Sequence, residues 1–145
     1  MKVWYMDLIN DILKSIEESE LSDTNYGEIR SEINDILQKI GYPDVKETIK
    51  LLKEYRFSPN ISDLRIGRYI RFIPLEGKNF MKLQNGGIII NIKKGDKDIL
   101  VICKNQRNRL FTVSFSKAII FQKLTTDETI ILDAIKYLKL WMLTI

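Results

Sequence analysis

The sequence predicts an α+β fold, with N-terminal helices, a five-stranded antiparallel SH3-like barrel or curled sheet, and a C-terminal helix. Apolar residues recur at helical spacing over the first part of the chain, and from Arg65 onward the period changes to two. Thr125 and Glu128 have the spacing of a capping box and precede a last helical pattern. We therefore expect an acidic helical segment over residues 1–60 and a basic β module with its capped C-terminal helix over residues 61–145.

Three amphipathic patterns make up the N-terminal segment. The first covers Tyr5 to Glu20, with Leu8, Ile9, Ile12, Leu13 and Ile16 at helical spacing. The second places Ile29, Ile33, Ile36, Leu37 and Ile40 on one stripe, and Gly41 follows it where a helix-terminating glycine belongs. The third begins at Pro43, ends before Ser58-Pro59, and is expected to have Val45, Ile49, Leu52 and Tyr55 on its inner face.

Five short strands are expected after Arg65, because the side chains alternate between two faces in segments bounded by turn residues. Their ranges are Gly67–Pro74, Ile88–Ile92, Asp98–Lys104, Leu110–Phe115 and Ile119–Lys123. Hairpin turns at residues 94–97 and 105–108 join the central strands. Phe111, Val113 and Phe115 share one face, which we expect to point into the core.

The Gly86-Gly87 pair has two interpretations. It could allow a phosphate to approach the backbone, but no P-loop lysine and serine follow it, and the next element is a strand. The pair therefore predicts a bulge or a tight entry into the strand.

The last helical pattern is apolar on one face. That face comprises Ile131, Ala134, Ile135, Leu138, Trp141 and Met142. An apolar face of this kind has to be covered, either by the β module or by a partner. Leu138, Trp141 and Met142 are the candidate residues through which this helix would bind a partner, and if that partner is a second copy of the chain the protein is a homo-oligomer.

Composition excludes several kinds of enzyme and metal site. The chain of 145 residues has no histidine and a single cysteine, Cys103. This excludes nucleophile pairs that depend on histidine, disulfides within the chain and multi-cysteine zinc sites. Cys103 lies in an apolar run and is expected to be buried, and the acidic residues between positions 17 and 23 are interpreted as a solvated helix face. We expect no catalytic residues, no cofactor and no metal, and hence no enzyme.

Positive charge is concentrated in the β module. Residues 65–124 contain 13 Lys and Arg against 3 Asp and Glu, a net charge of +10, whereas residues 1–64 have a net charge of −5. This charge favours a nucleic acid or an acidic protein surface as partner, or pairing with the acidic helices of the same chain. The candidate binding residues are Arg65, Arg68, Arg71, Lys94, Lys97, Arg107 and Arg109. Because the two hairpin turns lie at opposite ends of a strand, their cations need not form one patch.

No membrane segment is expected. The longest apolar runs are strand-sized, far below the roughly 18 residues that would span a bilayer. Acidic residues interrupt the apolar start of the chain before a signal peptide could form. We therefore expect a cytoplasmic location without membrane contact.

Three motifs in the β module resemble those of a group of viral proteins. They are Gly67-Arg68-Tyr69-Ile70-Arg71-Phe72, Gly86-Gly87-Ile88-Ile89 and Phe111-Thr112-Val113. They are similar to the G-x-x-I-R-Y, G-G-x-L and W-S-V strands of a small β module in uncharacterised proteins of large nucleocytoplasmic DNA viruses. Here Phe72 replaces the tyrosine, and Phe111-Thr112 replaces the Trp-Ser of the third motif. The resemblance covers residues 65–124 and implies a non-enzymatic module of a viral protein, in the host cytoplasm or the virion.

The sequence thus predicts a non-catalytic binding or assembly module that acts through a basic β surface. Two alternatives stay open at this point. One is a protein that binds RNA or single-stranded DNA through the same basic residues, and the other is a homo-oligomeric structural subunit held by the C-terminal helix.

Overall fold

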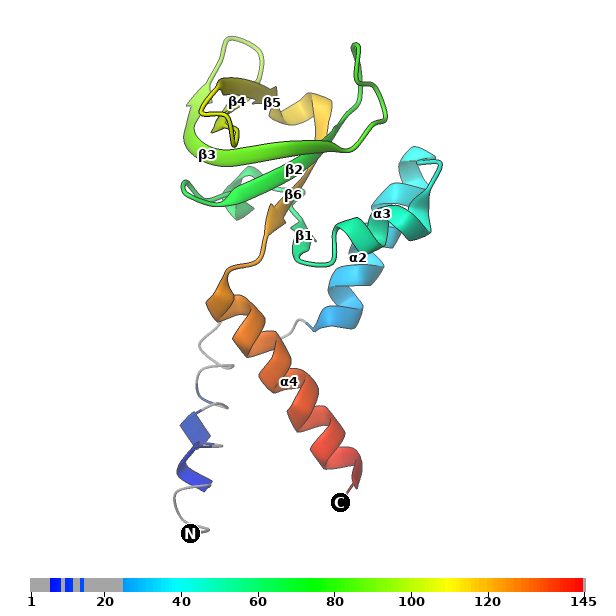
Figure 1. Cartoon of the computed structure of the whole chain (residues 1–145), viewed down its shortest axis with the longest axis vertical. Helices are drawn as coiled ribbons and strands as arrows, with labels where there is room; N and C mark the ends of the chain where they lie inside the picture. The colour runs from blue at the N-terminus through cyan, green and yellow to red at the C-terminus, as the bar shows by residue number, and fades with distance from the viewer. Residues whose placement is uncertain (1–5, 9, 12–13, 15–24, 145) are drawn as a thin grey trace. The chain divides into compact units, whose positions relative to one another are not determined.

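A computed structural model describes residues 6–8, 10–11, 14 and 25–144 of the chain. It shows an α+β protein with helices, an antiparallel sheet and a C-terminal helix, which confirms the predicted fold class at this level (Figure 1). The predicted helix over Tyr5–Glu20 lies for the most part outside the described residues. The chain forms two compact units, residues 1–31 with 125–145 and residues 32–124. The predicted division into residues 1–60 and 61–145 stays a prediction.

Helix α2 (Tyr26–Ile40) matches the second predicted pattern. Its start is capped by the side chain of Asn25, whose Oδ1 accepts a hydrogen bond from the backbone N–H of Glu28 at 3.0 Å. The stripe is buried at Ile29, Ile33 and Leu37. Gly41, with φ +71°, ends the helix, and the N–H of Tyr42 turns back to the carbonyl of Leu37 at 2.9 Å.

Helix α3 (Val45–Leu51) is shorter than predicted. Pro43 lies before the helix, and Tyr55 is part of strand β1 (Tyr55–Phe57) instead of the inner helix face. The expectation for Tyr55 was therefore wrong. The reason is long-range pairing, since β1 is hydrogen-bonded to the strand that comes last along the chain, with Tyr55 opposite Lys123.

The sheet contains six strands rather than five, because β1 was not expected. The other five were predicted, and they are β2 (Tyr69–Pro74), β3 (Gln84–Lys94), β4 (Ile99–Lys104), β5 (Leu110–Ser114) and β6 (Ala118–Lys123). The order across the sheet is β1-β6-β2-β3-β4-β5, with all neighbours antiparallel. The two edge strands β1 and β5 do not pair, so the sheet is not a closed barrel.

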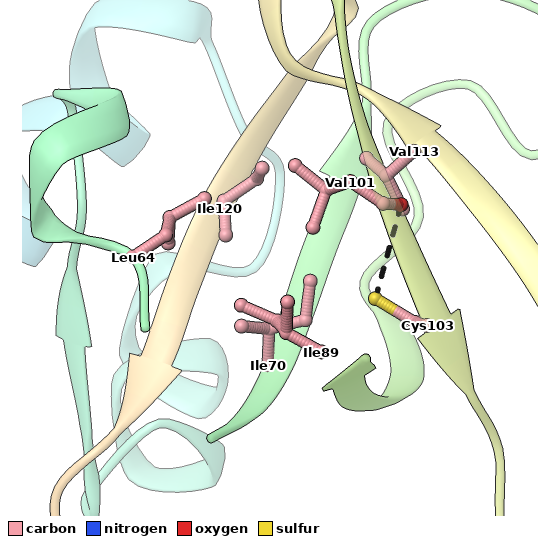
Figure 2. Close-up of a cluster of buried hydrophobic side chains, with 7 residues drawn as sticks. All are labelled: Leu64, Ile70, Ile89, Val101, Cys103, Val113 and Ile120. Atoms are coloured by element: carbon pink, nitrogen blue, oxygen red, sulfur yellow. Dashed lines mark hydrogen bonds between the residues drawn. The ribbon is translucent and has the colours of Figure 1, made fainter. Parts of the chain in front are cut away.

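Strands β2 to β6 enclose one apolar core. Figure 2 shows seven of its buried residues, which come from all five of these strands and from the segment before β2: Leu64, Ile70, Ile89, Val101, Cys103, Val113 and Ile120. Cys103 is fully buried, as predicted, and this burial raises the pKa of its thiol to about 12. Phe111 and Phe115 pack against this core, as predicted.

The opposite face of β2 and β6 is buried as well. Ile73 and Phe121 are fully inaccessible, and they lie on the other side of their strands from the core residues Ile70 and Ile120. A buried glutamine joins the segment before β2 to β6, since Gln122 accepts from the N–H of Arg65 at 2.9 Å and donates to the carbonyl of Asp63 at 3.0 Å. This connection fixes the start of β2 against its neighbour.

Helix α4 (Thr126–Thr144), in the unit of residues 1–31 and 125–145, begins with the predicted capping box. The N–H of Thr125 donates to the Glu128 carboxylate at 2.9 Å, and the N–H of Glu128 donates to Thr125 Oγ1 at 3.1 Å. Within the same unit the Tyr26 hydroxyl donates to Asp133 at 3.0 Å. Burial and this carboxylate raise the pKa of Tyr26 to about 12, so the phenol keeps its proton and the link between α2 and α4.

Candidate functional site: an arginine groove beside the sheet

A groove with a volume of about 510 Å³ lies between the paired strands β2 and β3 on one side and the β4–β5 turn on the other, within the unit of residues 32–124. We call it the arginine groove. The β2–β3 side contributes Tyr69, Phe72, Gln84, Asn85 and Gly86. The β4–β5 side contributes Asn105, Gln106, Arg107, Arg109 and Phe111. The only charged residues in this lining are the two arginines.

The first wall of the groove is shaped by a β-bulge. Ile70 pairs with Gly87 and Phe72 with Gln84, so two residues of β3, Asn85 and Gly86, stand opposite one residue of β2. Gly86 has φ +70°, and a Cβ at this position would lie 1.8 Å from the carbonyl oxygen of Ile70. Only glycine fits there, which confirms the bulge interpretation of the Gly86-Gly87 pair.

The second wall is a turn held by one side chain. Asn105 Oδ1 accepts hydrogen bonds from the backbone N–H groups of Arg107 at 2.9 Å and Arg109 at 3.0 Å. Asn108 has φ +61°, a conformation that asparagine tolerates better than most residues. The turn therefore presents Arg107 and Arg109 from a fixed backbone.

The side chains of Arg107 and Arg109 are exposed. Among the described residues, no carboxylate lies within 4.0 Å of either guanidinium group. Ion pairs do occur elsewhere on the module, at Lys123–Glu54 (3.8 Å) and Lys117–Glu76 (3.2 Å). Pairing with acidic residues of the same chain thus accounts for some of the lysines, and the described acids leave the two groove arginines uncompensated.

Aromatic rings lie beside these cations. Phe72 and Phe111 are stacked, with ring centroids 5.9 Å apart and an interplanar angle of 24°. Both rings are half-buried, and both pack against the core as well as lining the groove. Tyr69, also half-buried, adds a third ring. The groove therefore combines cations with apolar flat surfaces.

Arg71 borders the groove without lining it. Its Nε donates to the carbonyl of Gln84 and its Nη2 to Asn85 Oδ1, both at 3.2 Å. Arg71 is thus tied to the bulge and supports the wall of the groove. Its charge also reaches Tyr55, whose pKa is raised by burial and lowered in part by Arg71.

The remaining predicted cations lie elsewhere. Arg65 donates to the carbonyls of Ser62 and Leu64, and Arg68 donates to the carbonyl of Lys123 at 3.3 Å. Lys94 and Lys97 lie at the β3–β4 turn, at the other end of β4, a distance of about 17 Å along a strand of this length. Of the seven predicted basic residues, the fold brings Arg107 and Arg109 into the groove and places Arg71 beside it.

Sequence reasoning missed the polar neutral residues of the groove. Two amide pairs lie on opposite walls, Gln84-Asn85 at the bulge in β3 and Asn105-Gln106 in the β4–β5 turn. Glutamine and asparagine are neighbours in the sequence at residues 84–85 and again at residues 105–106, and this repeat was the signal that the sequence offered.

The candidate partner helix is α4. Leu138 is half-buried, whereas Trp141 and Met142 are 50% and 69% exposed. Exposed apolar side chains also occur at Tyr137, Leu140 and Leu143. Leu132 and Ile135 lie on the buried face of α4. The helix therefore has more apolar side chains than the described residues bury.

In the part of the chain that the structure describes, no helix is long and apolar enough to cross a membrane. The described residues also contain no group of three His, Cys, Asp or Glu that could hold a metal ion. Comparisons with protein-family models, with curated proteins and with solved structures find no match to this chain. The resemblance of residues 65–124 to a viral β module and the expected cytoplasmic location therefore stay predictions.

Proposed function

We propose that this protein is a non-catalytic binding module whose basic β surface holds an anionic partner in the arginine groove. The observation that carries the proposal is the pair Arg107 and Arg109, fixed by the Asn105 turn and without a carboxylate within 4.0 Å among the described residues. Exposed guanidinium groups on a fixed backbone are suited to carboxylate or phosphate.

The residue types of the lining support a binding role. Tyr69 is the only titratable residue there besides the two arginines, and the other side chains are amides and phenylalanines. Such a set can bind and orient a ligand but offers no acid–base pair near neutral pH.

The connectivity of the sheet supports an SH3-like scaffold for this module. Strands β2 to β5 form a meander, a short 3-10 helix (Phe115–Lys117) follows, and β6 returns to pair with β2. We propose that the five strands are an SH3-like barrel that stays open between its edges, with β1 added beside β6. Small barrels of this kind commonly use the connections between strands for binding.

Two charge-reversal variants test the proposal. Arg107→Glu/Arg109→Glu inverts the charge of the groove, and Lys94→Glu/Lys97→Glu makes the same change of charge at the other end of β4. Binding of a fluorescent single-stranded oligonucleotide and of fluorescent polyglutamate is measured by anisotropy from about 50 mM salt upward.

The groove variant should lose at least about tenfold in affinity for whichever polyanion binds, and the turn variant less than about threefold. Equal losses in the two variants would place binding outside the groove. Absence of binding to both probes at about 50 mM salt would exclude the proposed function itself.

A second candidate function is a homo-oligomeric subunit held by α4, favoured by the exposure of Tyr137, Met142 and Leu143 at 69%, 69% and 83%. Removal of residues 139–145 should then convert an oligomer to a monomer in light scattering. A full-length protein that is already monomeric would rule this candidate out.

A further inference from the structure

We infer that the anionic partner of the arginine groove is a single-stranded nucleic acid, with its phosphates on Arg107 and Arg109 and its bases on the aromatic and amide surface beside them. This inference rests on the proposed function and goes beyond it, because it names the class of ligand. The alternative anionic ligand is an acidic peptide, and the two differ in what they require from the groove besides positive charge.

The first distinguishing feature is the aromatic surface. Phe72 and Phe111 stack on each other and both line the groove, with Tyr69 nearby. An acidic peptide needs cations but has no use for flat apolar faces next to them. Nucleobases stack on such faces, and arginine with adjacent aromatic rings is the combination by which proteins hold unpaired strands.

The second feature is the hydrogen-bonding character of the amides. The amide nitrogen of Gln84 donates to the carbonyl of Lys82 at 2.9 Å, so its oxygen stays available as an acceptor. Asn105 uses its oxygen for the turn and Asn85 uses its oxygen for Arg71, so their amide nitrogens stay available as donors. A nucleobase edge presents both donors and acceptors, whereas a carboxylate only accepts. The groove thus matches a base edge better than an acidic side chain.

The third feature is the size and location of the groove. Its volume of about 510 Å³ lies in the range of sites that hold small ligands. In a duplex the bases are stacked inside and cannot reach Tyr69 or Phe72, so only an unpaired strand can use both parts of the lining. We therefore expect a preference for single strands over duplexes of equal charge.

The test compares ligands that share their backbone charge and differ in their bases. The wild-type full chain is titrated with a single-stranded 12-mer as DNA and as RNA of one sequence, with an abasic DNA 12-mer, with a duplex, and with polyglutamate. The single strands should bind at least about tenfold more tightly than the abasic strand, the duplex and polyglutamate. Comparison of the affinities for the DNA and the RNA 12-mer shows whether deoxyribose or ribose is preferred.

A variant separates base stacking from charge. Tyr69→Leu keeps an apolar side chain on β2 and removes the ring. It should weaken binding of the 12-mer by about fivefold or more and leave the abasic strand unaffected. Because the ligand comparison uses the wild-type chain, poor folding of the variant would not prevent a decision.

Two results would overturn the inference. If the abasic strand binds as tightly as the normal strand, the bases make no contribution, and the groove is only a site for phosphate. If polyglutamate binds more tightly than either nucleic acid, the partner is an acidic peptide. In both cases the proposed function would survive, since it fails only if no polyanion binds or if the groove variant loses no more affinity than the turn variant.

Discussion

Gly86 determines the shape of the first wall of the groove. Alanine at this position would have to adopt φ +70° and place its Cβ 1.8 Å from the Ile70 oxygen, so the bulge would have to open. We expect Gly86→Ala to lower the free energy of unfolding by at least about 3 kcal/mol in urea denaturation.

Gly77 is the matched control for this substitution. Its φ is +86°, and a Cβ at this position would meet no atom within 4 Å beyond its chain neighbours. Gly77→Ala should therefore cost only about 1 kcal/mol, the cost of the left-handed backbone. Equal costs at the two glycines would mean that the close approach at Gly86 is not what the bulge requires.

Asp98 makes the second residue-level prediction. Its carboxylate accepts from Ser116 Oγ at 2.5 Å and from the N–H of Ile99 at 2.7 Å, and the Ser116 hydrogen bond is the main cause that lowers its pKa below the ordinary 3.8. Because the pKa of Asp98 is lower in the folded than in the unfolded chain, its ionised carboxylate stabilises the fold fully at a pH above the pKa of the unfolded chain. This stabilisation is lost as the pH falls through the pKa of the folded chain. Asp98→Asn should therefore lower the urea midpoint at pH 7, and the difference from wild type should shrink as the solution is acidified below the unfolded pKa. A difference that stays constant on acidification would contradict the assignment.

Single residues were predicted from the sequence where their role is local. Gly86-Gly87 as a bulge and Cys103 as a buried thiol follow from residue type and immediate neighbours. The role of Arg71 could not be obtained in this way. Its hydrogen bonds to Gln84 and Asn85 depend on the register of β2 against β3, which the spacing of arginines along the chain does not contain.

Among the helices and strands, the capping box of α4 gives the clearest prediction. Thr125 and Glu128 exchange hydrogen bonds at 2.9 and 3.1 Å at the start of this helix. Thr125→Ala should lower stability by about 1 kcal/mol, and Thr125→Ser, which keeps the acceptor, should cost almost nothing. Circular dichroism during urea denaturation measures both. Equal stability of the alanine variant and wild type would show that α4 does not depend on this cap.

Helices and strands were predictable where the spacing of apolar residues within the element itself indicates its type. The five strands β2 to β6, α2 and α4 all have a period that their own residues establish. The error at Tyr55 has a different cause. The spacing of Tyr55 from Leu52 fits a helix, but the backbone of Tyr55 pairs with that of Lys123. Pairing with a residue so distant in sequence cannot be recognised from the residues around Tyr55.

For the molecule as a whole, the sequence predicted a basic β module, and the fold determines which of its cations lie together. Two hairpin turns of the same charge lie at opposite ends of β4, and only the one at Arg107 and Arg109 faces the bulge and the aromatic rings. The groove arises from segments distant in sequence, namely residues 69–72, 84–86 and 105–111. For this reason the charge of the module was predictable and the location of the candidate site was not.

If the arginine groove is the binding surface, amide chemical-shift mapping should locate the ligand there. The ¹⁵N-labelled full chain is titrated with the single-stranded 12-mer at low salt. We expect the largest shifts at the amides of Gly86, Asn105, Arg107 and Arg109, with little change at residues 94–97. Largest shifts at the β3–β4 turn or along α4, with the groove amides unchanged, would show that the groove is not the binding surface.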